Sequence, residues 1–330
     1  MSMTICVIGS NSFSGASYCK YLLEKGYQVI GISRSPEAIP ALLPYSWANS
    51  ANKVNFFQLD VNQDLAEISS VLDRLKPSHV YNFAAQSMVG QSWDFPEHWF
   101  MTNVVSMIKL HNVLRHKDYL DRYIHITTPE VYGSCSGYID ESQVFNPSTP
   151  YAVSRAAADM SLKTFFDVHK FPVISTRAAN VYGAGQQLYR IIPRTILSIL
   201  LGQKLSLHGG GHSERSFIHI DDVSTATHLI AEQGTLGDCY HIATPSTVTI
   251  RQLVELICQT MSANFDEVCQ VTDDRKGKDA AYLLNTEKLR NELAWTDKIS
   301  LEQGLASTIA WARDNIASLS QQPLDYIHKP

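Results

Sequence analysis

The sequence lacks the excess of positive charge and the long apolar segments that nucleic-acid-binding and membrane proteins need. Its 27 Lys and Arg residues are outnumbered by 32 Asp and Glu residues, so the formal net charge is -5 at pH 7. No basic cluster would attract nucleic acid or an anionic lipid surface. The first apolar run, residues 4–10, is too short to span a bilayer or to form a signal peptide. We therefore expect a cytoplasmic protein without nucleic-acid or membrane partners.

Cysteine is also scarce, and the spacings typical of metal ligands are missing. The six cysteines are scattered without a CxxC pair, which predicts reduced, mostly buried thiols. A segment rich in His and Asp, residues 208–222, has neither the HExxH form nor another defined ligand spacing. We therefore expect no metal site.

Short apolar runs alternate with amphipathic segments through the first half of the chain. Runs rich in Val, Ile and aromatic residues predict buried strands at residues 4–9, 27–33, 54–59, 79–85 and 122–127. Helical spacing between them predicts helices within residues 14–26, 64–77 and 103–116. Repeated βα units imply an α/β fold with a doubly wound parallel Rossmann sheet. Ligands of such sheets bind beyond the carboxyl ends of the strands.

The regular pattern ends near residue 178. The following residues are irregular and rich in Gly, Arg and His, a strand-and-helix passage then returns, and a largely helical region ends the sequence. We predict that residues 1–178 and a return segment, 213–240, form a dinucleotide-binding Rossmann domain. Residues 179–212 and 241–330 would form a smaller, discontinuous α/β substrate-binding lobe over the ligand edge of the sheet.

The segment GSNSFSG, residues 9–15, follows the first predicted strand and opens the first predicted helix. At such a junction, backbone N–H groups and a helix N-terminus bind the pyrophosphate of a dinucleotide. Gly9 and Gly15 fit a GxxGxxG pattern, and Ser12 stands where the middle glycine belongs. Serine is small enough for close approach, although it tolerates fewer backbone angles. The loop indicates a dinucleotide cofactor.

The ends of the second and third predicted strands carry the residues that would select this cofactor. Enzymes that prefer NAD usually place an acid after the second strand, whereas Ser33 and Arg34 offer a hydroxyl and a guanidinium that suit a 2′-phosphate. These two residues favour NADP as the cofactor, with NAD as the alternative. Arg34 could otherwise be a solvated arginine in a loop without a cofactor contact. Asp60 and Val61 would lie near the adenine, unless Asp60 caps a helix.

A tyrosine and a cation, Tyr151 and Arg155, stand four residues apart on a predicted helix that Thr149 could cap and Pro150 could begin. Their side chains would therefore share one helix face. The fifth predicted strand ends in TTPEVYG, which brings a hydroxyl and a carboxylate to the same edge of the sheet. Each residue alone has a structural explanation, but together they indicate a reactive site.

These segments resemble the extended short-chain dehydrogenase/reductase family, and within it the dTDP-glucose and GDP-mannose 4,6-dehydratases. The resemblance covers nearly the whole length and is carried by residues 9–34, by NFAAQSMVGQSWDFPEHWFMTNV, by TTPEVYG, by STPYAVSRAAAD, by TRAANVYGAGQQLYRIIPR and by ERSFIHIDDV. It implies an enzyme that converts a nucleoside-diphosphate hexose to a 4-keto-6-deoxyhexose.

The resemblance also implies roles for individual residues. Thr128, Tyr151 and Arg155 would take the places of the family's Thr, Tyr and Lys beside a tightly bound cofactor, with Tyr151 removing the proton of the sugar 4-hydroxyl. Glu130 would remove the C5 proton as water leaves C6. Simple 4-epimerases need no such base and commonly have small hydroxyl residues there, so Glu130 favours dehydration.

Two residues depart from the family pattern. Pro129 stands where dTDP-glucose dehydratases have an aspartic acid that helps water to leave, although GDP-mannose enzymes lack that aspartate too. Arg155 replaces lysine, whose roles are to bind the nicotinamide ribose and to lower the tyrosine pKa. Arginine supplies the same charge through a larger, differently shaped fork. We therefore predict that Tyr151 is a working base.

Further ligand contacts and an oligomer follow from the same resemblance. The cofactor-binding set extends to Phe13 and Ala84, and Tyr151 and Arg155 belong to it as well. The substrate diphosphate and nucleoside would be bound by Asn180, Arg190, Arg215 and Arg275, and Ser87 would touch the sugar. Relatives pair through the helix that carries the tyrosine and the helix before it. A homodimer is therefore expected, with a tetramer as the alternative, and SRAAADMSLKTFF would supply the apolar surface.

Two other classes of function stay open at this point. Within enzymes, the alternatives are a 4-epimerase or a 5,6-dehydratase on the same fold. Outside enzymes, Ser12, Pro129 and Arg155 together would suit a non-catalytic cofactor-binding sensor. Retention of Thr128, Glu130 and Tyr151 argues against a sensor, which needs no base at C5.

Overall fold

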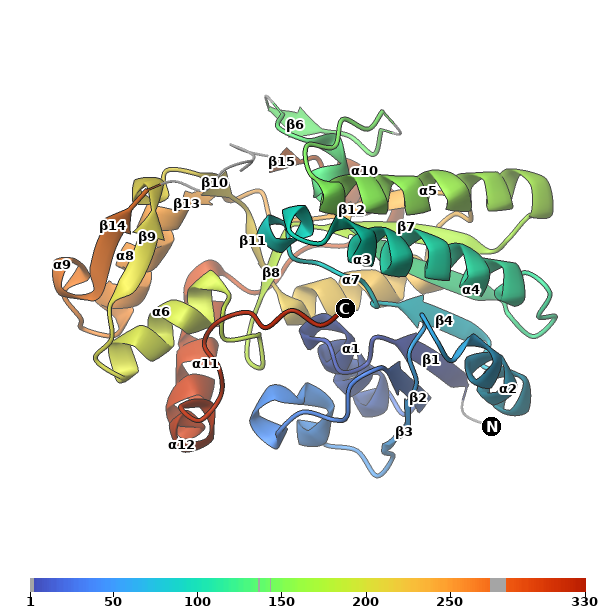
Figure 1. Cartoon of the computed structure of the whole chain (residues 1–330), viewed down its shortest axis with the longest axis horizontal. Coiled ribbons are helices and arrows are strands. Elements are labelled where there is room, and N and C mark those ends of the chain that lie inside the picture. The colour runs from blue at the N-terminus through green and yellow to red at the C-terminus, as the bar shows by residue number, and fades with distance from the viewer. Residues whose placement is uncertain (1–2, 136, 143, 274–282) are drawn as a thin grey trace.

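A seven-stranded parallel sheet lies at the centre of the molecule (Figure 1). The computed structural model describes residues 3–135, 137–142, 144–273 and 283–330. The strand order is β12-β7-β5-β4-β1-β2-β3, and every neighbouring pair is parallel. The strands are β1 (Thr4–Ile8), β2 (Gln28–Ser33), β3 (Val54–Gln58), β4 (His79–Asn82), β5 (Arg122–Thr127), β7 (Val173–Ala178) and β12 (Cys239–Ile242). The five predicted strands and the doubly wound α/β fold are confirmed.

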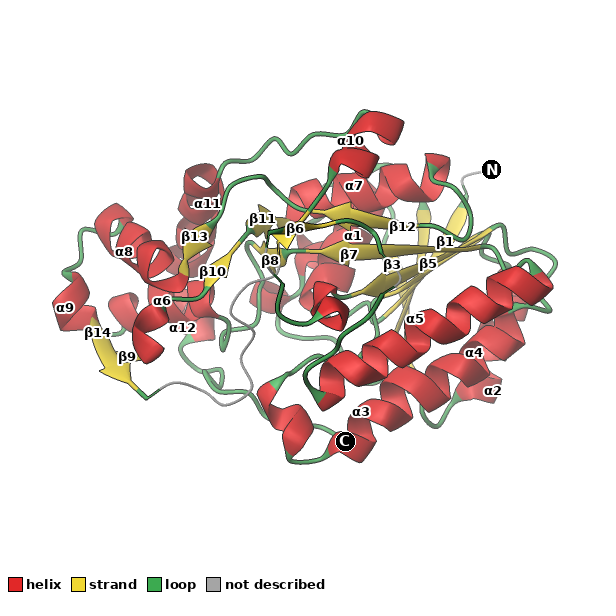
Figure 2. Ribbon diagram, turned by 90° about the horizontal axis from the view of Figure 1, so that it is seen from above, coloured by secondary structure: helices red, strands yellow, loops and turns green. Residues whose placement is uncertain are grey.

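Helices cover both faces of this sheet (Figure 2). The strands are buried on both sides, so alternate residues of β1 enter different cores: Cys6 and Ile8 pack on one face, and Ile5 and Val7 on the other. One face is covered by α2 (Leu65–Leu75), α4 (Met107–Leu114) and α5 (Pro150–His169), and the other by α1 (Phe13–Glu24) and α7 (Ile220–Gln233). The helix predicted within residues 103–116 begins instead as a π-helix, η4 (Met101–Ser106), which continues into α4.

The order of the strands reverses between β1 and β4, because β1 pairs with β2 on one side and with β4 on the other. Chain segments leaving these two strands turn to opposite faces, which opens a crevice at their carboxyl ends. The N-terminal end of α1 lies at the same edge. The topology therefore places a ligand site next to the loop of residues 9–15.

A second group of elements lies beside this edge of the sheet (Figure 1). Its core is formed largely by side chains of α6, α8 and α11. The elements are α6 (Ile191–Leu200), β9 (Leu205–His208), α8 (Ile250–Thr260), α9 (Phe265–Val268), β14 (Cys269–Thr272), α11 (Leu301–Asp314) and α12 (Ile316–Leu319). Between the two groups lie the short pairs β8 (Asn180–Tyr182) with β11 (Phe217–His219) and β10 (Glu214–Arg215) with β13 (Val248–Thr249). The pair β6 (Tyr138–Ile139) with β15 (Leu283–Leu284) lies near the start of α5, and α10 (Glu287–Leu293) packs against β12 and α7.

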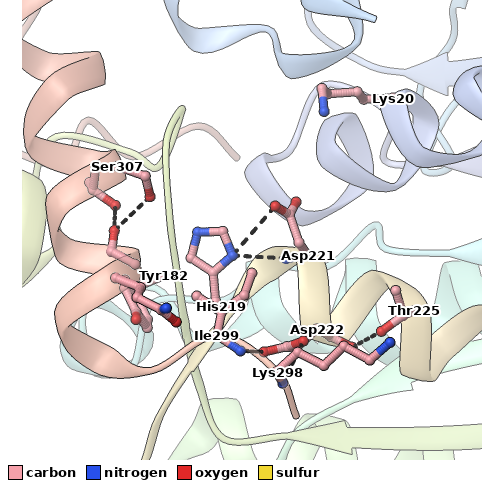
Figure 3. A network of polar contacts seen from close by, with 12 residues as sticks. Lys20, Tyr182, His219, Asp221, Asp222, Thr225, Lys298, Ile299 and Ser307 are labelled. Carbon is pink, nitrogen blue, oxygen red and sulfur yellow. Dashed lines mark hydrogen bonds and ion pairs between the residues drawn. The ribbon is translucent and has the colours of Figure 1, made fainter. Parts of the chain in front are cut away.

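A buried carboxylate ties α7 to the segment that leads into α11 (Figure 3). Asp222, at the start of α7, accepts hydrogen bonds from the backbone N–H groups of Lys298 (3.1 Å) and Ile299 (2.9 Å). Next to it, His219 packs edge-on against Tyr182, with 5.4 Å between the ring centres. The residues of the histidine-rich segment shown here thus have structural contacts that join the second group of elements to the first.

The remaining helices are short. They comprise α3 (Pro96–Phe100) and the 3₁₀ turns η1 (Pro40–Leu42), η2 (Pro44–Trp47), η3 (Gly90–Trp93), η5 (Pro129–Tyr132) and η6 (Gly209–Gly211). Within the described ranges, no helix has both the length and the apolar character needed to cross a bilayer. Beyond α12, the last residues of the chain run back across to the crevice side of the sheet (red in Figure 1) and end near α3 (Figure 2).

Candidate active site

A cavity of about 190 Å³ lies at the carboxyl ends of β1, β2, β3 and β4. Seven of the predicted cofactor-binding residues line it: Gly9, Ser12, Ser33, Arg34, Asp60, Val61 and Ala84. These residues come from four separate strand ends, and the sheet brings them to one place. The structure therefore places these predicted residues around one cavity.

The loop between β1 and α1 is shaped for close backbone approach. Gly9 has φ +85°, and a Cβ atom there would lie 2.6 Å from the backbone nitrogen of Ala84. A Cβ atom at Gly15 would lie 2.2 Å from the carbonyl oxygen of Gly9. Ser12 caps α1, since its hydroxyl accepts from the Gly15 N–H (3.1 Å) and donates to the Gly9 carbonyl (2.7 Å). The serine in the middle position thus stabilises the turn, and both glycines are required by it.

Phe13 contributes to this loop in a different way from the residues that line the cavity. Its side chain is 5% exposed and packs in the core formed with α7. What Phe13 offers a pyrophosphate is therefore its backbone N–H in the first turn of α1, where four such groups lack helical partners.

The selectivity residues lie where the sequence predicts. The Ser33 hydroxyl accepts from the Asn11 N–H at 2.9 Å, and Arg34 lines the cavity at the end of β2. Asp60 does not cap α2, because the residue preceding that helix is Asp64. Its carboxylate instead accepts from the Asn62 N–H at 2.8 Å, which forms a turn after β3.

Helix α5 begins as predicted, with the Thr149 hydroxyl accepting from the Ala152 N–H (3.2 Å) and Pro150 in the first turn. Tyr151 and Arg155 are both buried, at 7% and 2% exposure. The helix therefore carries a phenol and a guanidinium on one inward face, next to the carboxyl end of β5.

Four predicted side chains act on the Tyr151 hydroxyl. Burial raises its pKa above the ordinary value, and the charge of Glu130 raises it further. The charge of Arg155, a hydrogen bond with Thr128 and the charge of Arg190 act in the opposite direction. The structure therefore brings Thr128, Glu130, Tyr151 and Arg155 together, with one of the predicted substrate arginines beside them.

Thr128 and Glu130 are positioned by η5, which directly follows β5. The Thr128 hydroxyl accepts from the Glu130 N–H at 3.3 Å and so caps this short helix. Pro129 starts the turn and is buried, which fixes the chain direction between the hydroxyl and the carboxylate. Glu130 is half-buried. Its carboxylate interacts electrostatically with Tyr151, the other base that the family resemblance implies.

Arg155 belongs to a buried charge cluster on the inner side of α5. Asp159, one turn further along, forms an ion pair with Arg177 of β7 at 2.8 Å. Burial alone would raise the Asp159 pKa, but Arg177, His125 and Arg155 hold it at about 2. Arg177 pairs with this carboxylate directly, whereas Arg155 acts on it only through its charge, so two guanidinium charges face one carboxylate.

The Arg155 guanidinium fits a further polar ligand. One terminal nitrogen donates to the Ile126 carbonyl. Its Nε and its other terminal nitrogen are buried and have no hydrogen-bond partner within the described part of the chain. Buried donors of a charged group are costly to leave unsatisfied. A ribose of a bound dinucleotide offers hydroxyl acceptors of the required kind.

The predicted substrate residues lie on the elements between the sheet and the second group of helices. Asn180 begins β8, Arg190 precedes α6 and stacks over Tyr189 (5.4 Å), and Arg215 lies in β10. Ser87 is exposed in the loop after β4. Arg275 lies outside the described residues.

Three polar residues of the site were not predicted from the sequence. Asn11 lines the cavity and donates to the Ser35 carbonyl at 2.9 Å. Gln86 lines it too, and Asn103 from the π-helix η4 binds both its backbone groups, accepting from its N–H (2.9 Å) and donating to its carbonyl (3.0 Å). The amide of Asn103 also donates to Ser154 at 2.9 Å. Asn103 is one of several polar residues in this helix, so the sequence does not single it out as the bridge.

The parallel sheet with its dinucleotide loop and its Tyr151–Arg155 pair defines the class of the protein as an extended short-chain dehydrogenase/reductase. The family model described as GDP-mannose 4,6 dehydratase matches residues 6–308. The chain therefore belongs to the GDP-mannose 4,6-dehydratase family, within which the resemblance seen in the sequence is confirmed.

Similar proteins extend over the full length of the chain. A dTDP-glucose 4,6-dehydratase of Streptomyces niveus is 31% identical, with 96% of this chain and 94% of the relative covered. A solved dTDP-glucose 4,6-dehydratase of Streptomyces venezuelae, with NAD and TYD bound, matches with a TM-score of 0.90, 28% identity and coverage of 98% and 100%. A solved UDP-glucose 4-epimerase of Thermotoga maritima matches with a TM-score of 0.86, 25% identity and coverage of 95% and 100%. Because dehydratases and epimerases both share this fold, individual residues must separate them.

Proposed function

We propose that the protein is a nucleoside-diphosphate-sugar 4,6-dehydratase, which converts a hexose to a 4-keto-6-deoxyhexose. The reaction oxidises C4, eliminates water across C5 and C6, and reduces C6. The observation that carries the proposal is the placement of Glu130 one short turn after Thr128 and within electrostatic range of Tyr151. A second base beside the tyrosine is needed for elimination and is not needed for epimerisation.

Each residue of the site has a defined task in this reaction. Tyr151 removes the proton of the 4-hydroxyl, and the positive charge of Arg155 stabilises the phenolate that precedes this step. Thr128 donates a hydrogen bond to the phenolate and at the same time fixes the N–H of Glu130. The ketone at C4 acidifies the C5 proton, which Glu130 accepts as hydroxide leaves C6.

A nicotinamide dinucleotide, when bound, accepts hydride from C4 and returns it to C6. Gly9, Ser12, Gly15 and the first turn of α1 would hold its pyrophosphate, while Arg155 would hold a ribose through its unpaired buried donors. Solved relatives carry NAD. For this chain we propose NADP, because β2 ends at Ser33 and is followed by Arg34 and Ser35. All three residues line the cavity, and none of them is a carboxylate. Titration with both cofactors decides, and equal affinities would reject NADP.

The substrate class follows from Arg190, the predicted substrate arginine that lies near Tyr151. Arg190 acts on the tyrosine electrostatically, so a diphosphate bound by its guanidinium would place the attached sugar near both bases. We include Asn180, Arg215 and Arg275 in the nucleotide site as further proposals. We also propose that the reaction takes place in the cytoplasm.

The exposed apolar side chains of α5 and η4 support the proposal of a homodimer. Met160 and Val153 on α5 are 61% and 39% exposed, and Met101 and Val105 on η4 are 48% and 40% exposed. Phe165 and Phe166 of α5 were also predicted to form this surface, but they pack partly into the core instead.

A mass assay tests the function directly. Purified protein is incubated with dTDP-glucose, GDP-mannose and UDP-glucose in turn, each with NAD and with NADP, and the sugar nucleotides are analysed for loss of one water. We expect such a product from one of them. A product of unchanged mass but changed configuration would identify an epimerase, and dinucleotide binding without turnover of any nucleotide sugar would identify a sensor.

A further inference from the structure

The last five residues of the chain, Tyr326–Pro330, lie on the rim of the dinucleotide cavity. Two wall residues from different strands bind them: the Arg34 guanidinium donates to the carbonyls of Lys329 (3.1 Å) and Pro330, and the Gln86 amide donates to the Lys329 carbonyl at 2.6 Å. The Lys329 ammonium donates to the Ser35 hydroxyl at 3.3 Å. This tail segment therefore bridges the β2 and β4 sides of the cavity.

His328 anchors the tail segment against the helix that follows β4. Its ring stacks on Trp99 (5.1 Å between centres, interplanar angle 9°) and on Phe95 (5.4 Å, 2°). Its Nε2 lies 2.8 Å from Nδ1 of His98, and the Tyr326 hydroxyl lies 3.2 Å from its Nδ1. Tyr326 in turn packs edge-on against Tyr189, the neighbour of Arg190. Specific contacts on both sides of His328 indicate a docked segment.

The cavity of about 190 Å³ lies next to this segment, and its lining comes from the ends of β1, β2, β3 and β4 and from η4. The segment contacts two of these lining residues, Arg34 and Gln86, from outside the cavity. It therefore lies where it can cover a ligand that those strand ends bind.

We propose that Tyr326–Pro330 is a part of the cofactor site that closes over the bound dinucleotide and retains it between the two hydride transfers. The inference rests on the proposed function, in which the dinucleotide that gains a hydride at C4 must stay in place until it returns the hydride to C6. A dinucleotide that leaves in its reduced form would strand the sugar as a ketone. Entry of a new cofactor requires release of the segment from Arg34 and Gln86.

The charged surroundings of His328 make the docked state sensitive to pH. Burial, His98 and Arg34 lower the His328 pKa, and Asp94 opposes them. Docking is therefore favoured above the ordinary histidine pKa of about 6.5 and weakens as pH falls, because burial and the charge of Arg34 oppose a positive charge on the docked His328. This pH dependence gives the test a second readout.

Cofactor release is the measurement that tests the inference. Wild type is loaded with NADPH or NADH and mixed rapidly with excess oxidised cofactor, and the loss of bound nicotinamide fluorescence gives the dissociation rate constant. Deletion of residues 326–330 should raise this constant by roughly tenfold or more, since several hydrogen bonds and a stacked ring are lost. His328→Ala should raise it by about threefold, and Val168→Ala, whose side chain is 72% exposed near the C-terminal end of α5, should leave it unchanged.

Turnover supplies an independent comparison. With added oxidised cofactor left out, wild type should sustain many turnovers, whereas the truncated protein should stop early and recover when cofactor is added. Unchanged or slower release from a folded variant, or tighter cofactor binding after truncation, would overturn the inference while leaving the dehydratase function intact. Should the truncated protein misfold, His328→Ala decides alone. Absence of dinucleotide binding by wild type would instead reject the proposed function, and the inference with it.

Discussion

Replacement of Arg155 by Met should raise the apparent pKa of the base that starts the reaction. The two side chains lie four residues apart on α5, a spacing at which Cβ atoms are ~5–6 Å apart. At ~5 Å and an effective dielectric constant of ~20, a unit positive charge stabilises a phenolate by about 3 kcal/mol. This corresponds to about two pKa units. In the structure burial and Glu130 raise the Tyr151 pKa, and the charge of Arg155 acts against them in the direction that this estimate requires.

The surroundings of Arg155 indicate that the Met variant will fold. The guanidinium makes one hydrogen bond, to the Ile126 carbonyl, and two of its nitrogens have no partner within the described ranges. Asp159 keeps its 2.8 Å ion pair with Arg177 when Arg155 is replaced. Methionine is also unbranched and flexible, so it can follow the path of the arginine side chain. Loss of activity can therefore be assigned to the charge once a thermal melt shows a folded protein.

The assay is the pH dependence of substrate oxidation in wild type, Arg155→Met and Arg155→Lys. The Met variant should lose most activity near neutral pH and regain part of it about two pH units higher. The Lys variant should show little change in the profile, because the charge remains, but an altered cofactor affinity, because one ammonium does not reproduce the fork. Normal turnover of Arg155→Met with an unmoved profile would refute this reasoning and leave Tyr151 without its proposed activator.

Three further outcomes follow from the same structure. Glu130→Gln should permit C4 oxidation but stop loss of water, so that absorbance of the reduced cofactor near ~340 nm persists with substrate bound; unchanged dehydration would show that another group is the base. Met160→Glu should shift the protein from dimer to monomer in light scattering at micromolar concentration, and a wild type that is already monomeric would contradict the proposed pairing. Lowering the pH from about 7.5 to about 5.5 should speed cofactor release from wild type more than from His328→Ala, because the lowered His328 pKa means that docking is lost on protonation.

The sequence was sufficient to predict five of the seven strands and the residues at their ends. Strongly apolar strands and the spacing of Gly9, Gly15, Tyr151 and Arg155 depend on local chain geometry, which periodicity and motif spacing report directly. The Thr149 cap of α5 was predictable for the same reason.

The parts that could not be predicted depend on contacts between distant segments. Asn103 binds Gln86 only because a π-helix turns its amide inward, and no local pattern distinguishes such a turn from an α-helix. Asp159 and Arg177 become partners only when β7 packs against α5. The tail segment is polar and short, so nothing in its own sequence indicates that it returns across some 290 residues to Arg34.

The shared carboxylate of Asp159 also constrains how this site could change through evolution. Loss of Asp159 alone would leave two buried guanidinium groups without their counter-charge, which costs about 3–5 kcal/mol for a broken buried pair. Loss of Arg155 first removes one of those charges and makes the second substitution milder, so the two effects should not add. Exchange between lysine and arginine at position 155 keeps the positive charge, so both types of site need Asp159 equally, and only a neutral residue at position 155 would relax that need.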